Sequence, residues 1–353
     1  MNKEEQNKTT NDKKIKEIQN GELLEKRYRI IRKIAEGGMA EVYEAFDEYL
    51  NRKVAIKIMT VTLSKDVKAE EKAYKEYEAI AHLTNSQNVV KVFARFEYEK
   101  RQCIVLELMQ GYTLKDWIYK IGSCTNKELK FYFSQINKAV MAIHNENIVH
   151  RDIKPENILI SYCGEVRVTD FGVSVHGSGD KQDKKIIGTS KYMAPELVQS
   201  HPATNLSDIY ALGVVLYELA TGVPPFVDVK PILVAVKHVK EKAVLPRRIK
   251  PELSEDLEYI IMKSISKNPE ERYLSVQEFN KDLEKVWEKK PILKKPLKNQ
   301  ILLYSSKTKK YSLKPMVDKY LFNPKFLKNS LLITFLSLAI VLFLVVAIII
   351  IWL

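Results

Sequence analysis

The spacing of the apolar residues changes once along this chain, near Gly111, and this change limits the possible folds more than any other feature. Before Gly111 the apolar residues alternate over short runs, and a helical spacing occurs once, over Lys65–Leu83. Short alternating runs predict strands, here at Tyr28–Ile34, Glu41–Ala45, Val54–Lys57 and twice within Val89–Leu108. Later the spacing becomes helical, most clearly over Lys127–Asn145, Ser207–Thr221 and Leu253–Lys267. Strands followed by helices predict an α+β fold with a strand-rich lobe at 26–110 and a mainly helical lobe at 111–288.

The two ends of the chain differ from this central part. Residues 1–25 are polar, so we expect a mobile N-terminal arm. Residues 289–330 are rich in lysine and contain four prolines, which argues against a long helix and predicts a basic linker. No apolar stretch follows Met1, so we expect no secretory signal peptide.

The last 23 residues, 331–353, carry no charged side chain. A helix of that length is about 35 Å long and exceeds the ~30 Å hydrocarbon core of a bilayer. The alternative is a buried core helix, but those rarely run so far without a charge. We therefore expect a single-pass transmembrane helix in the cell membrane. The lysines before it predict a cytoplasmic location for the folded part and contact of the linker with anionic lipid. Because nothing follows Leu353, no extracytoplasmic domain is expected.

The net charge of +13 comes mainly from the tail. Of the 57 basic residues, 12 lysines follow Val286 with only two acids, which leaves 45 basic and 42 acidic residues before it. The central part therefore lacks the basic excess typical of a nucleic-acid-binding domain, and no nucleic-acid partner is expected. Three cysteines, Cys103, Cys124 and Cys163, are too few and too scattered for a disulfide framework or a zinc site.

Four motifs with chemical meaning occur in order. The first is Ile34–Val42, where Gly37 and Gly38 would let backbone N–H groups approach phosphate oxygens. The second is the apolar run Val54–Lys57, which ends in a lysine. The third, His150–Asn157, reads His-Arg-Asp-Ile-Lys-Pro-Glu-Asn and offers a carboxylate that can accept a proton and an amide oxygen that can bind Mg²⁺. The fourth, Val168–Gly172, ends in Asp-Phe-Gly.

Together these motifs resemble those of Ser/Thr protein kinases, and the bacterial transmembrane kinases look most similar. The resemblance covers Tyr28–Trp287 and includes a later run, Gly188–Glu196, that closes the activation segment of the family. It implies the bilobal protein kinase fold, ATP as the phosphoryl donor, and Mg²⁺ with Mn²⁺ as a substitute. One departure is Ala35, where the family has its first glycine, and we expect altered nucleotide affinity from it.

The resemblance also implies roles for individual residues. Asp152 would accept the proton of a substrate hydroxyl, and Lys154 would neutralise charge on the transferring phosphoryl group. Lys57 would bind phosphates and pair with a glutamate of the next helix, best matched by Glu76, with Glu70, Glu71 and Glu78 as nearby alternatives. Metal ligands would be Asn157 and Asp170. The nucleotide would contact Ala35, Gly37, Gly38, Val42, Ala55, Lys57, Glu107, Met109 and Leu159. Supporting roles would fall to Leu106 beside the adenine, to Asp208 behind the catalytic loop, and to an Arg272–Glu196 pair.

The expected function is transfer of the ATP γ-phosphate to Ser or Thr hydroxyls of proteins at a membrane. Tethered copies would meet often, so the expected partners include a second copy of the chain in a homo-dimer for trans-autophosphorylation. Ser305, Ser306 and Thr308 are candidate sites, with an unmodified linker as the alternative for each. The competing interpretation is a pseudokinase, a membrane-tethered nucleotide-binding scaffold. A membrane adaptor that uses the fold only for docking is a third.

Overall fold

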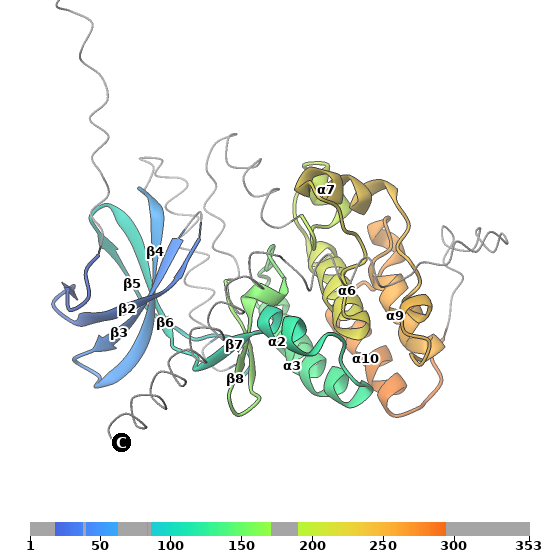
Figure 1. Cartoon of the computed structure of the whole chain (residues 1–353), viewed down its shortest axis with the longest axis horizontal. Coiled ribbons are helices and arrows are strands. Elements are labelled where there is room, and N and C mark those ends of the chain that lie inside the picture. The colour runs from blue at the N-terminus through green and yellow to red at the C-terminus, as the bar shows by residue number, and fades with distance from the viewer. Residues whose placement is uncertain (1–17, 38–39, 63–82, 84–85, 171–189, 294–353) are drawn as a thin grey trace, which may run out of the picture. The chain divides into compact units, whose positions relative to one another are not determined.

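A computed structural model describes residues 18–37, 40–62, 83, 86–170 and 190–293 (Figure 1). Within these ranges a sheet formed by the first part of the chain is followed by a mainly helical part (Figure 1). This arrangement confirms the predicted order of strands before helices. In the described part of the chain, no helix combines the length and the apolar character needed to cross a membrane, and the predicted span at 331–353 lies outside that part.

The first sheet is antiparallel throughout and has the strand order β1-β2-β3-β4-β6-β5. Its strands are β1 (Leu23–Leu24), β2 (Tyr28–Glu36), β3 (Ala40–Asp47), β4 (Arg52–Thr62), β5 (Val92–Tyr98) and β6 (Arg101–Glu107). Alternate residues of these strands face a compact core beneath the sheet. The sheet and this core together are called the sheet lobe. Two register shifts in β2 interrupt its pairing with β3, as β-bulges do.

The predicted arm at 1–25 is too long. Residues 18–25 belong to the sheet lobe, because Ile18 and Leu24 are buried in its core and β1 pairs with β2. Two apolar side chains in a polar stretch are enough to anchor it. Residues 1–17 lie outside the described residues.

A second, smaller sheet joins the two lobes. It contains β7 (Gly111–Thr113), β8 (Ile158–Ser161) and β9 (Val166–Val168). Gly111 lies so close to β8 that a Cβ atom there would meet the carbonyl oxygen of Ile160 at 1.9 Å, so only glycine fits. The main chain before β5 pairs with β9 through a parallel bridge between Val89 and Val168. This sheet therefore connects the sheet lobe to the helices by backbone hydrogen bonds.

The helical lobe is built around α6 (Asn205–Thr221), of which 15 residues are buried. The other helices among the described residues are α2 (Leu114–Ile121), α3 (Asn126–Asn145), α5 (Pro195–Val198), α7 (Pro231–Lys240), α8 (Pro246–Ile249), α9 (Glu255–Ser264) and α10 (Val276–Trp287), with short 3₁₀ turns η2 (Pro155–Asn157) and η3 (Pro269–Glu271). Thr125 and Glu128 form a capping box that begins α3. Gly213 lets α6 approach Ser264 of α9 closely.

The helix α9 is shorter than predicted, because it ends at Ser264 and not at Lys267. The ammonium group of Lys267 instead donates to the carbonyl oxygens of Lys237 and His238 at the end of α7. A tertiary contact therefore ends a helix that the apolar spacing alone would continue.

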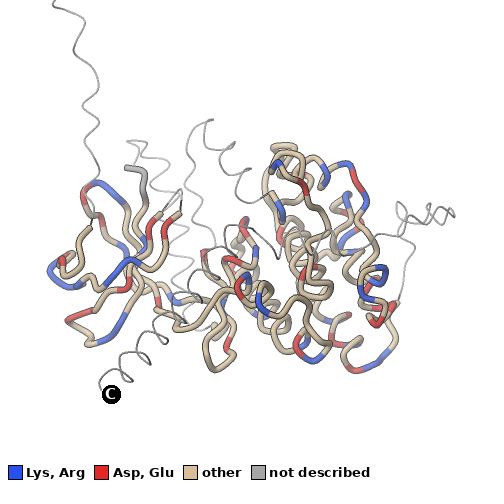
Figure 2. The backbone as a smooth tube through the Cα atoms, in the orientation of Figure 1, with Lys and Arg blue, Asp and Glu red and all other residues tan. Residues whose placement is uncertain are grey.

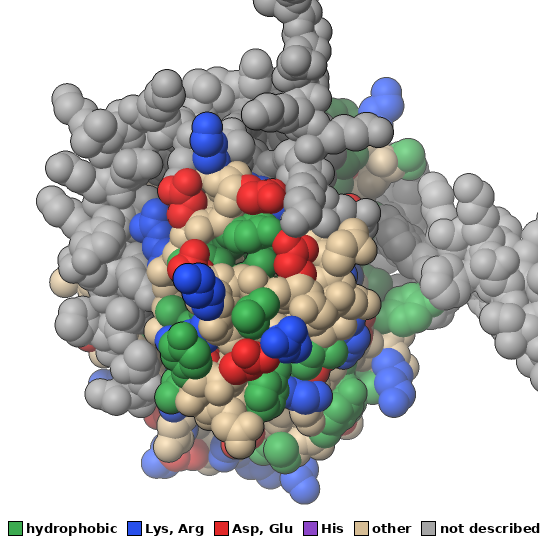
Figure 3. All heavy atoms as spheres, turned by 90° about the vertical axis from the view of Figure 1, so that its left-hand side faces the viewer, with side chains coloured by type: hydrophobic (Ala, Val, Ile, Leu, Met, Phe, Trp, Pro, Cys, Tyr) green, Lys and Arg blue, Asp and Glu red, His purple; other side chains and the backbone are tan. Residues whose placement is uncertain are grey.

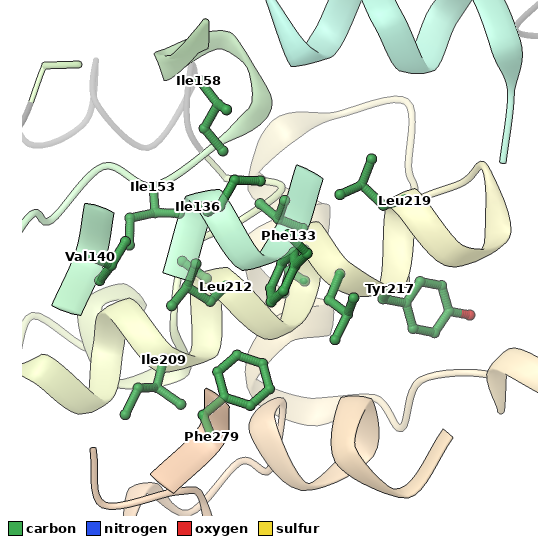
Figure 4. Close-up of a cluster of buried hydrophobic side chains, with 14 of the residues drawn as sticks. Phe133, Ile136, Val140, Ile153, Ile158, Ile209, Leu212, Tyr217, Leu219 and Phe279 are labelled. Carbon is green, nitrogen blue, oxygen red and sulfur yellow. The ribbon is translucent and has the colours of Figure 1, made fainter. Parts of the chain in front are cut away.

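The core of the helical lobe reaches the segment that carries the third motif. Ile153 and Ile158 are buried and point toward Ile136, Val140 and the side chains of α6 (Figure 4). Basic and acidic residues are interspersed along the described backbone (Figure 2), and the sheet-lobe face in Figure 3 mixes both signs with apolar side chains. The sheet-lobe face in Figure 3 therefore shows no continuous basic stripe among its described residues.

Candidate active site

The pleat of the sheet places the expected nucleotide-binding residues on one face. On β4 the residues Val54, Ile56 and Ile58 enter the lobe core, so Ala55 and Lys57 point to the opposite side. In-register partners share a face, and the partners here are Val42 with Lys57 and Leu106 with Ala55. Ala35 pairs with Val42 and extends the same face toward the turn. At the turn itself Gly37 donates its N–H to the Ala40 carbonyl oxygen at 2.9 Å.

Lys57 and Asp170 form an ion pair across the two lobes. The Lys57 Nζ atom lies 2.7 Å from the Asp170 Oδ1 atom, and the two side chains are 14% and 33% exposed. Asp170 follows β9 and has a φ angle of +64°, in the left-handed region that costs an L residue about 1 kcal/mol or more. The surrounding structure therefore holds this carboxylate in a strained position, facing the sheet lobe.

The residues of the third motif form a compact polar cluster. The Asp152 Oδ2 atom accepts hydrogen bonds from Lys154 Nζ at 2.7 Å and from Asn157 Nδ2 at 2.9 Å. Asn157 Nδ2 also donates to the Asp152 carbonyl oxygen at 2.8 Å. Because both amide hydrogens are used on Asp152, the Asn157 Oδ1 atom remains to accept or to coordinate. The side chains of Asp152 and Lys154 are about one-fifth exposed, so both remain in contact with solvent.

Asp208 braces this cluster from the interior. Its carboxylate accepts hydrogen bonds from the backbone N–H groups of His150 at 2.7 Å and Arg151 at 2.9 Å, and it lies 2.9 Å from His144 Nε2. Arg151 has a φ angle of +69°, so the loop bends sharply at this point. Asp208 is 1% exposed and sits on the first turn of α6. The loop position is therefore set by the central helix, in agreement with the supporting role that the resemblance to protein kinases implies for Asp208.

His150 is a scaffold residue in this geometry. Burial lowers the pKa of its imidazole, and the carboxylates of Asp208, Asp152 and Asp170 only partly oppose this effect. Both ring nitrogens are in contact with backbone groups, because Nδ1 accepts from the Asp152 N–H and Nε2 lies 3.1 Å from the Thr169 carbonyl oxygen. A neutral ring with Nε2 protonated satisfies both contacts. His150 thus links the Asp152 loop to the residue before Asp170.

The segment between β6 and β7 is held from two sides. The Glu107 N–H donates to the Lys91 carbonyl oxygen at 2.9 Å, and the Glu107 carboxylate is paired with Arg167 on β9. Met109 follows and is half-buried, as is Leu159 on β8, whose neighbours along the strand are buried in the helical core. The alternation of β8 therefore points Leu159 away from that core. The contact with Arg167 has no signal in the sequence, and only the structure reveals it.

A second buried ion pair lies where the activation segment would end. Arg272 donates through Nη1 and Nη2 to both carboxylate oxygens of Glu196, each at 2.8 Å. Burial alone would raise the pKa of Glu196, but the pair with Arg272 outweighs it and holds the pKa below its usual value. The expected pairing of these two residues is confirmed.

Two side chains near Asp152 offer oxygen ligands for a metal ion, too few to bind it without further ligands from a substrate or water. Among the described residues, no group of three His, Cys, Asp or Glu forms a complete metal site. Asn157 and Asp170 offer one amide oxygen and one carboxylate, which are hard ligands suited to Mg²⁺. Mg²⁺ in phosphoryl-transfer sites typically takes one or two protein ligands and completes its shell with phosphates and water.

Several expected site residues lie outside the described residues: Gly38, Glu76 with its alternatives, and the run from Phe171 to Thr189. The structure therefore brings together Asp152, Lys154 and Asn157 in one cluster and Lys57 with Asp170 in another. Sequence reasoning missed the polar network of Lys115, Tyr192 and Glu218, because its members are 26 to 103 positions apart.

Comparison with known proteins gives consistent matches. A family model described as "Protein kinase domain" matches residues 28–283. The serine/threonine-protein kinase PrkC of Bacillus subtilis is 36% identical over 265 residues, which cover 74% of this chain and 41% of the relative. The serine/threonine-protein kinase PknB of Mycobacterium tuberculosis is 36% identical over 276 residues, which cover 76% of this chain and 44% of the relative. A probable serine/threonine-protein kinase PknB of Lactococcus lactis is 34% identical over 311 residues, which cover 86% of this chain and 49% of the relative. This chain spans less than half the length of these relatives.

Proposed function

This chain belongs to the protein kinase family, and from that premise we propose that it is an active Ser/Thr protein kinase that phosphorylates proteins from ATP. The observation that carries the proposal is the hydrogen-bonded cluster of Asp152, Lys154 and Asn157. It sets a partly exposed carboxylate beside a cation and an amide oxygen, as transfer of a phosphoryl group to a hydroxyl requires.

In the proposed reaction, the Asp152 carboxylate accepts a hydrogen bond from the substrate hydroxyl and orients its oxygen toward the γ-phosphorus. The new O–P bond forms as the bond to the leaving ADP oxygen breaks, and the hydroxyl proton passes to Asp152. The Lys154 ammonium lies 2.7 Å from the Asp152 carboxylate, which holds the substrate hydroxyl in this reaction. Lys154 is therefore close enough to donate hydrogen bonds to oxygens of the transferring group. Lys57 donates to the inner phosphates from the sheet face that carries Val42 and Ala55.

Asn157 and Asp170 would hold Mg²⁺, which when bound neutralises charge on the phosphates. The chain itself contributes the two oxygen ligands and a backbone that fixes them. Thr169 donates its N–H to the Asn157 carbonyl oxygen at 2.9 Å, so the segments that carry the two ligands are joined directly. The Lys57–Asp170 pair orients both side chains toward the same place before nucleotide enters.

The test is phosphate transfer by the full chain, in detergent, with ATP and Mg²⁺. We expect mass gains of one or more phosphates on Ser or Thr, and transfer to a generic protein substrate. Asp152→Asn is expected to lower the rate about 10²–10⁴-fold without loss of folding, because it removes the proton acceptor. Lys57→Met is expected to abolish transfer, whereas the matched control Lys53→Met on the same strand retains it, since the described ion pair of Lys53 is with Glu44 and its side chain is 53% exposed.

A nucleotide-binding scaffold would give the opposite result. Nucleotide would still raise the melting temperature, but neither the parent chain nor Lys53→Met would transfer phosphate. In that case Ala35, at the position where the family has a glycine, would be the first residue to revert. Restored transfer in Ala35→Gly would assign the loss to this substitution.

We also propose that residues 331–353 anchor the kinase in a membrane and that the lysines of 294–328 contact anionic lipid. Support comes from the 23 uncharged residues and the 12 lysines after Val286. Tethering would raise the local concentration of copies and favour phosphorylation of one copy by another in a homo-dimer. The full chain is expected to remain with the membrane fraction after a carbonate wash, whereas deletion of 331–353 releases it. Release of the full chain by the wash would refute the anchor.

A further inference from the structure

The outer side of α7 carries a row of exposed aliphatic side chains. Val229, Ile232, Leu233 and Val236 are 80%, 53%, 43% and 40% exposed. Ile232, Leu233 and Val236 follow one another at helical spacing and share one side of α7, and Val229 stands just before the helix begins. These four residues are called the α7 apolar row. Single exposed apolar side chains are common on protein surfaces, but a contiguous row of them usually marks an interaction site.

The opposite side of α7 is fixed in the helical lobe. Val234, Ala235 and His238 are its buried residues. The His238 Nδ1 atom lies 2.8 Å from the Tyr210 hydroxyl of α6, and the Lys267 ammonium donates to the His238 carbonyl oxygen at 2.6 Å. The helix lies at an outer edge of the helical lobe (Figure 1). The apolar row is therefore held outward by a helix whose own position is fixed.

Lysines stand at both ends of the row. Lys230 precedes α7 and is exposed, and Lys240 and Lys242 follow its last apolar residue and are exposed too. Lys240 comes four residues after Val236 and so lies on the same side of the helix. An apolar row bounded by lysines is the pattern of helices that lie in the surface of an anionic bilayer.

The acids of this segment have other neighbours. Residues 228–242 contain two of them, Asp228 and Glu241. Asp228 pairs with Lys237, whose Nζ atom lies 3.1 Å from the Asp228 Oδ2 atom. Burial and then Arg272 lower the pKa of Lys267 to about 7, and Glu241 opposes both effects, so Glu241 lies near Lys267. The surface around the apolar row is therefore basic.

This charge favours one occupant over two others. A second copy of the chain that placed its own α7 on the row would bring lysine against lysine in either helix direction. A stable protein interface also buries about 800 Å² on each partner, more than four partly exposed side chains provide. The lysine-rich residues 294–328 carry the same sign of charge as the row's ends. An anionic lipid surface complements both the apolar row and its lysines.

We propose that α7 docks on the anionic surface of the membrane that holds the chain. Ile232, Leu233 and Val236 enter the headgroup region, and Lys230 and Lys240 lie beside lipid phosphates. The inference rests on the membrane anchor proposed above. The 37 residues from 294 to 330 reach at most about 120 Å when extended, so the tether lets α7 meet the bilayer.

The experiment places a fluorescent probe on the row. Cys163 is exposed whereas Cys103 and Cys124 are buried, so Cys163→Ser removes the accessible thiol. In this background Ile232→Cys receives an environment-sensitive fluorophore. The full chain is inserted, one copy per nanodisc, into phosphatidylcholine with or without phosphatidylglycerol, and a nitroxide-labelled lipid serves as quencher. The matched control is Leu274→Cys, at an apolar position that is 70% exposed and far from α7 in the chain.

The nitroxide lipid is expected to quench the probe at position 232 and not at position 274. Quenching should weaken in phosphatidylcholine alone. Lys230→Gln and Lys240→Gln should each lower the docking equilibrium about fivefold in the anionic nanodiscs, the effect of one lysine near an anionic surface. Lys281→Gln removes an exposed lysine of α10 and is expected to leave the quenching unchanged.

Equal quenching at positions 232 and 274 in the inserted chain would overturn the inference. So would a probe shift that requires several copies per nanodisc and occurs without quenching by lipid, because a second copy would then cover the row. If Ile232→Cys does not fold, Val236→Cys is the second probe position and decides. If the full chain does not float with vesicles, the proposed anchor fails and the docking fails with it. Phosphate transfer in detergent tests the kinase activity separately from both.

Discussion

The sheet lobe and the helical lobe hold their functional side chains in different ways. Among the described residues, the core of the sheet lobe has 11 buried residues and that of the helical lobe has 40. The sheet lobe places Val42, Ala55 and Lys57 on one face through pleat and register, and the cations that pair with its Glu44 are more than half exposed. The helical lobe instead fixes the Asp152 loop through the buried carboxylate of Asp208.

This difference explains which parts of the site tolerate change. A pleated sheet sets the direction of a side chain without needing any particular neighbour, so many sequences present the same face. The loop of Arg151 and the segment of Asp170 each contain a residue in the left-handed region, have no such default and need specific acceptors to stay in place. We therefore expect single substitutions to affect the helical lobe more strongly, and three measurements test this expectation.

The largest effect is expected for Asp208→Ala. This change leaves the buried N–H groups of His150 and Arg151 without their acceptor, which costs about 3 kcal/mol or more of unfolding free energy. The loop that carries Asp152 would also lose its position, so kcat should fall together with the melting temperature. Denaturant unfolding and kinase assays measure both. Asp208→Asn retains one acceptor oxygen and should lose less. An unchanged kcat in Asp208→Ala would show that the loop does not depend on this brace.

An intermediate effect is expected on acidification, and it belongs to the helical lobe. Burial lowers the pKa of His238 to about 3, with Lys267 adding to the shift, whereas an unfolded histidine titrates near 6.5. Below pH 6.5 the unfolded chain binds the proton and the folded chain does not. Stability is therefore fully present above pH 6.5 and falls as the pH drops toward 3, by about 1.4 kcal/mol per pH unit.

The measurement is the unfolding free energy at several pH values between 7.5 and 5. The pKa of His150 is also lowered, so His150 adds to the loss of stability at low pH. The difference in unfolding free energy between the parent chain and His238→Gln, taken at each pH, isolates the contribution of His238. The variant is less stable at pH 7.5, because the Tyr210 hydroxyl loses the Nδ1 partner at 2.8 Å, but its pH dependence should be shallower. Equal slopes for the two proteins would contradict the assignment.

The smallest effect is expected for Glu44→Gln in the sheet lobe. Glu44 pairs with Arg32 and Lys53, whose side chains are more than half exposed, and the pair with Lys53 is the main cause that lowers its pKa. Pairs with solvated cations contribute about 1 kcal/mol or less. Unfolding measurements at low and high salt should show a small loss that salt reduces further. A loss comparable to that of Asp208→Ala would remove the contrast between the lobes.

The amino-acid sequence by itself determined the class of fold and most of the site. Alternating and helical spacings place the strands around Val54–Lys57 and the long helix that the structure has at Asn126–Asn145, because burial on one face imposes a period on local residues. The ordered motifs similarly bring Asp152, Lys154 and Asn157 within five residues of one another, so their clustering follows from local chain geometry.

Only the tertiary structure decided contacts between residues far apart in the chain. The ion pairs Lys57–Asp170 and Glu107–Arg167 join positions separated by 113 and 60 residues. No local sequence pattern predicts a pair so far apart in the chain, because each of these charged residues taken alone resembles an ordinary surface residue. Two further contacts also join residues far apart in the chain. Lys267, just after α9, donates to the His238 carbonyl oxygen, and Lys115 pairs with Glu218. In each case a charged group at least partly removed from solvent has its partner on another element of the fold.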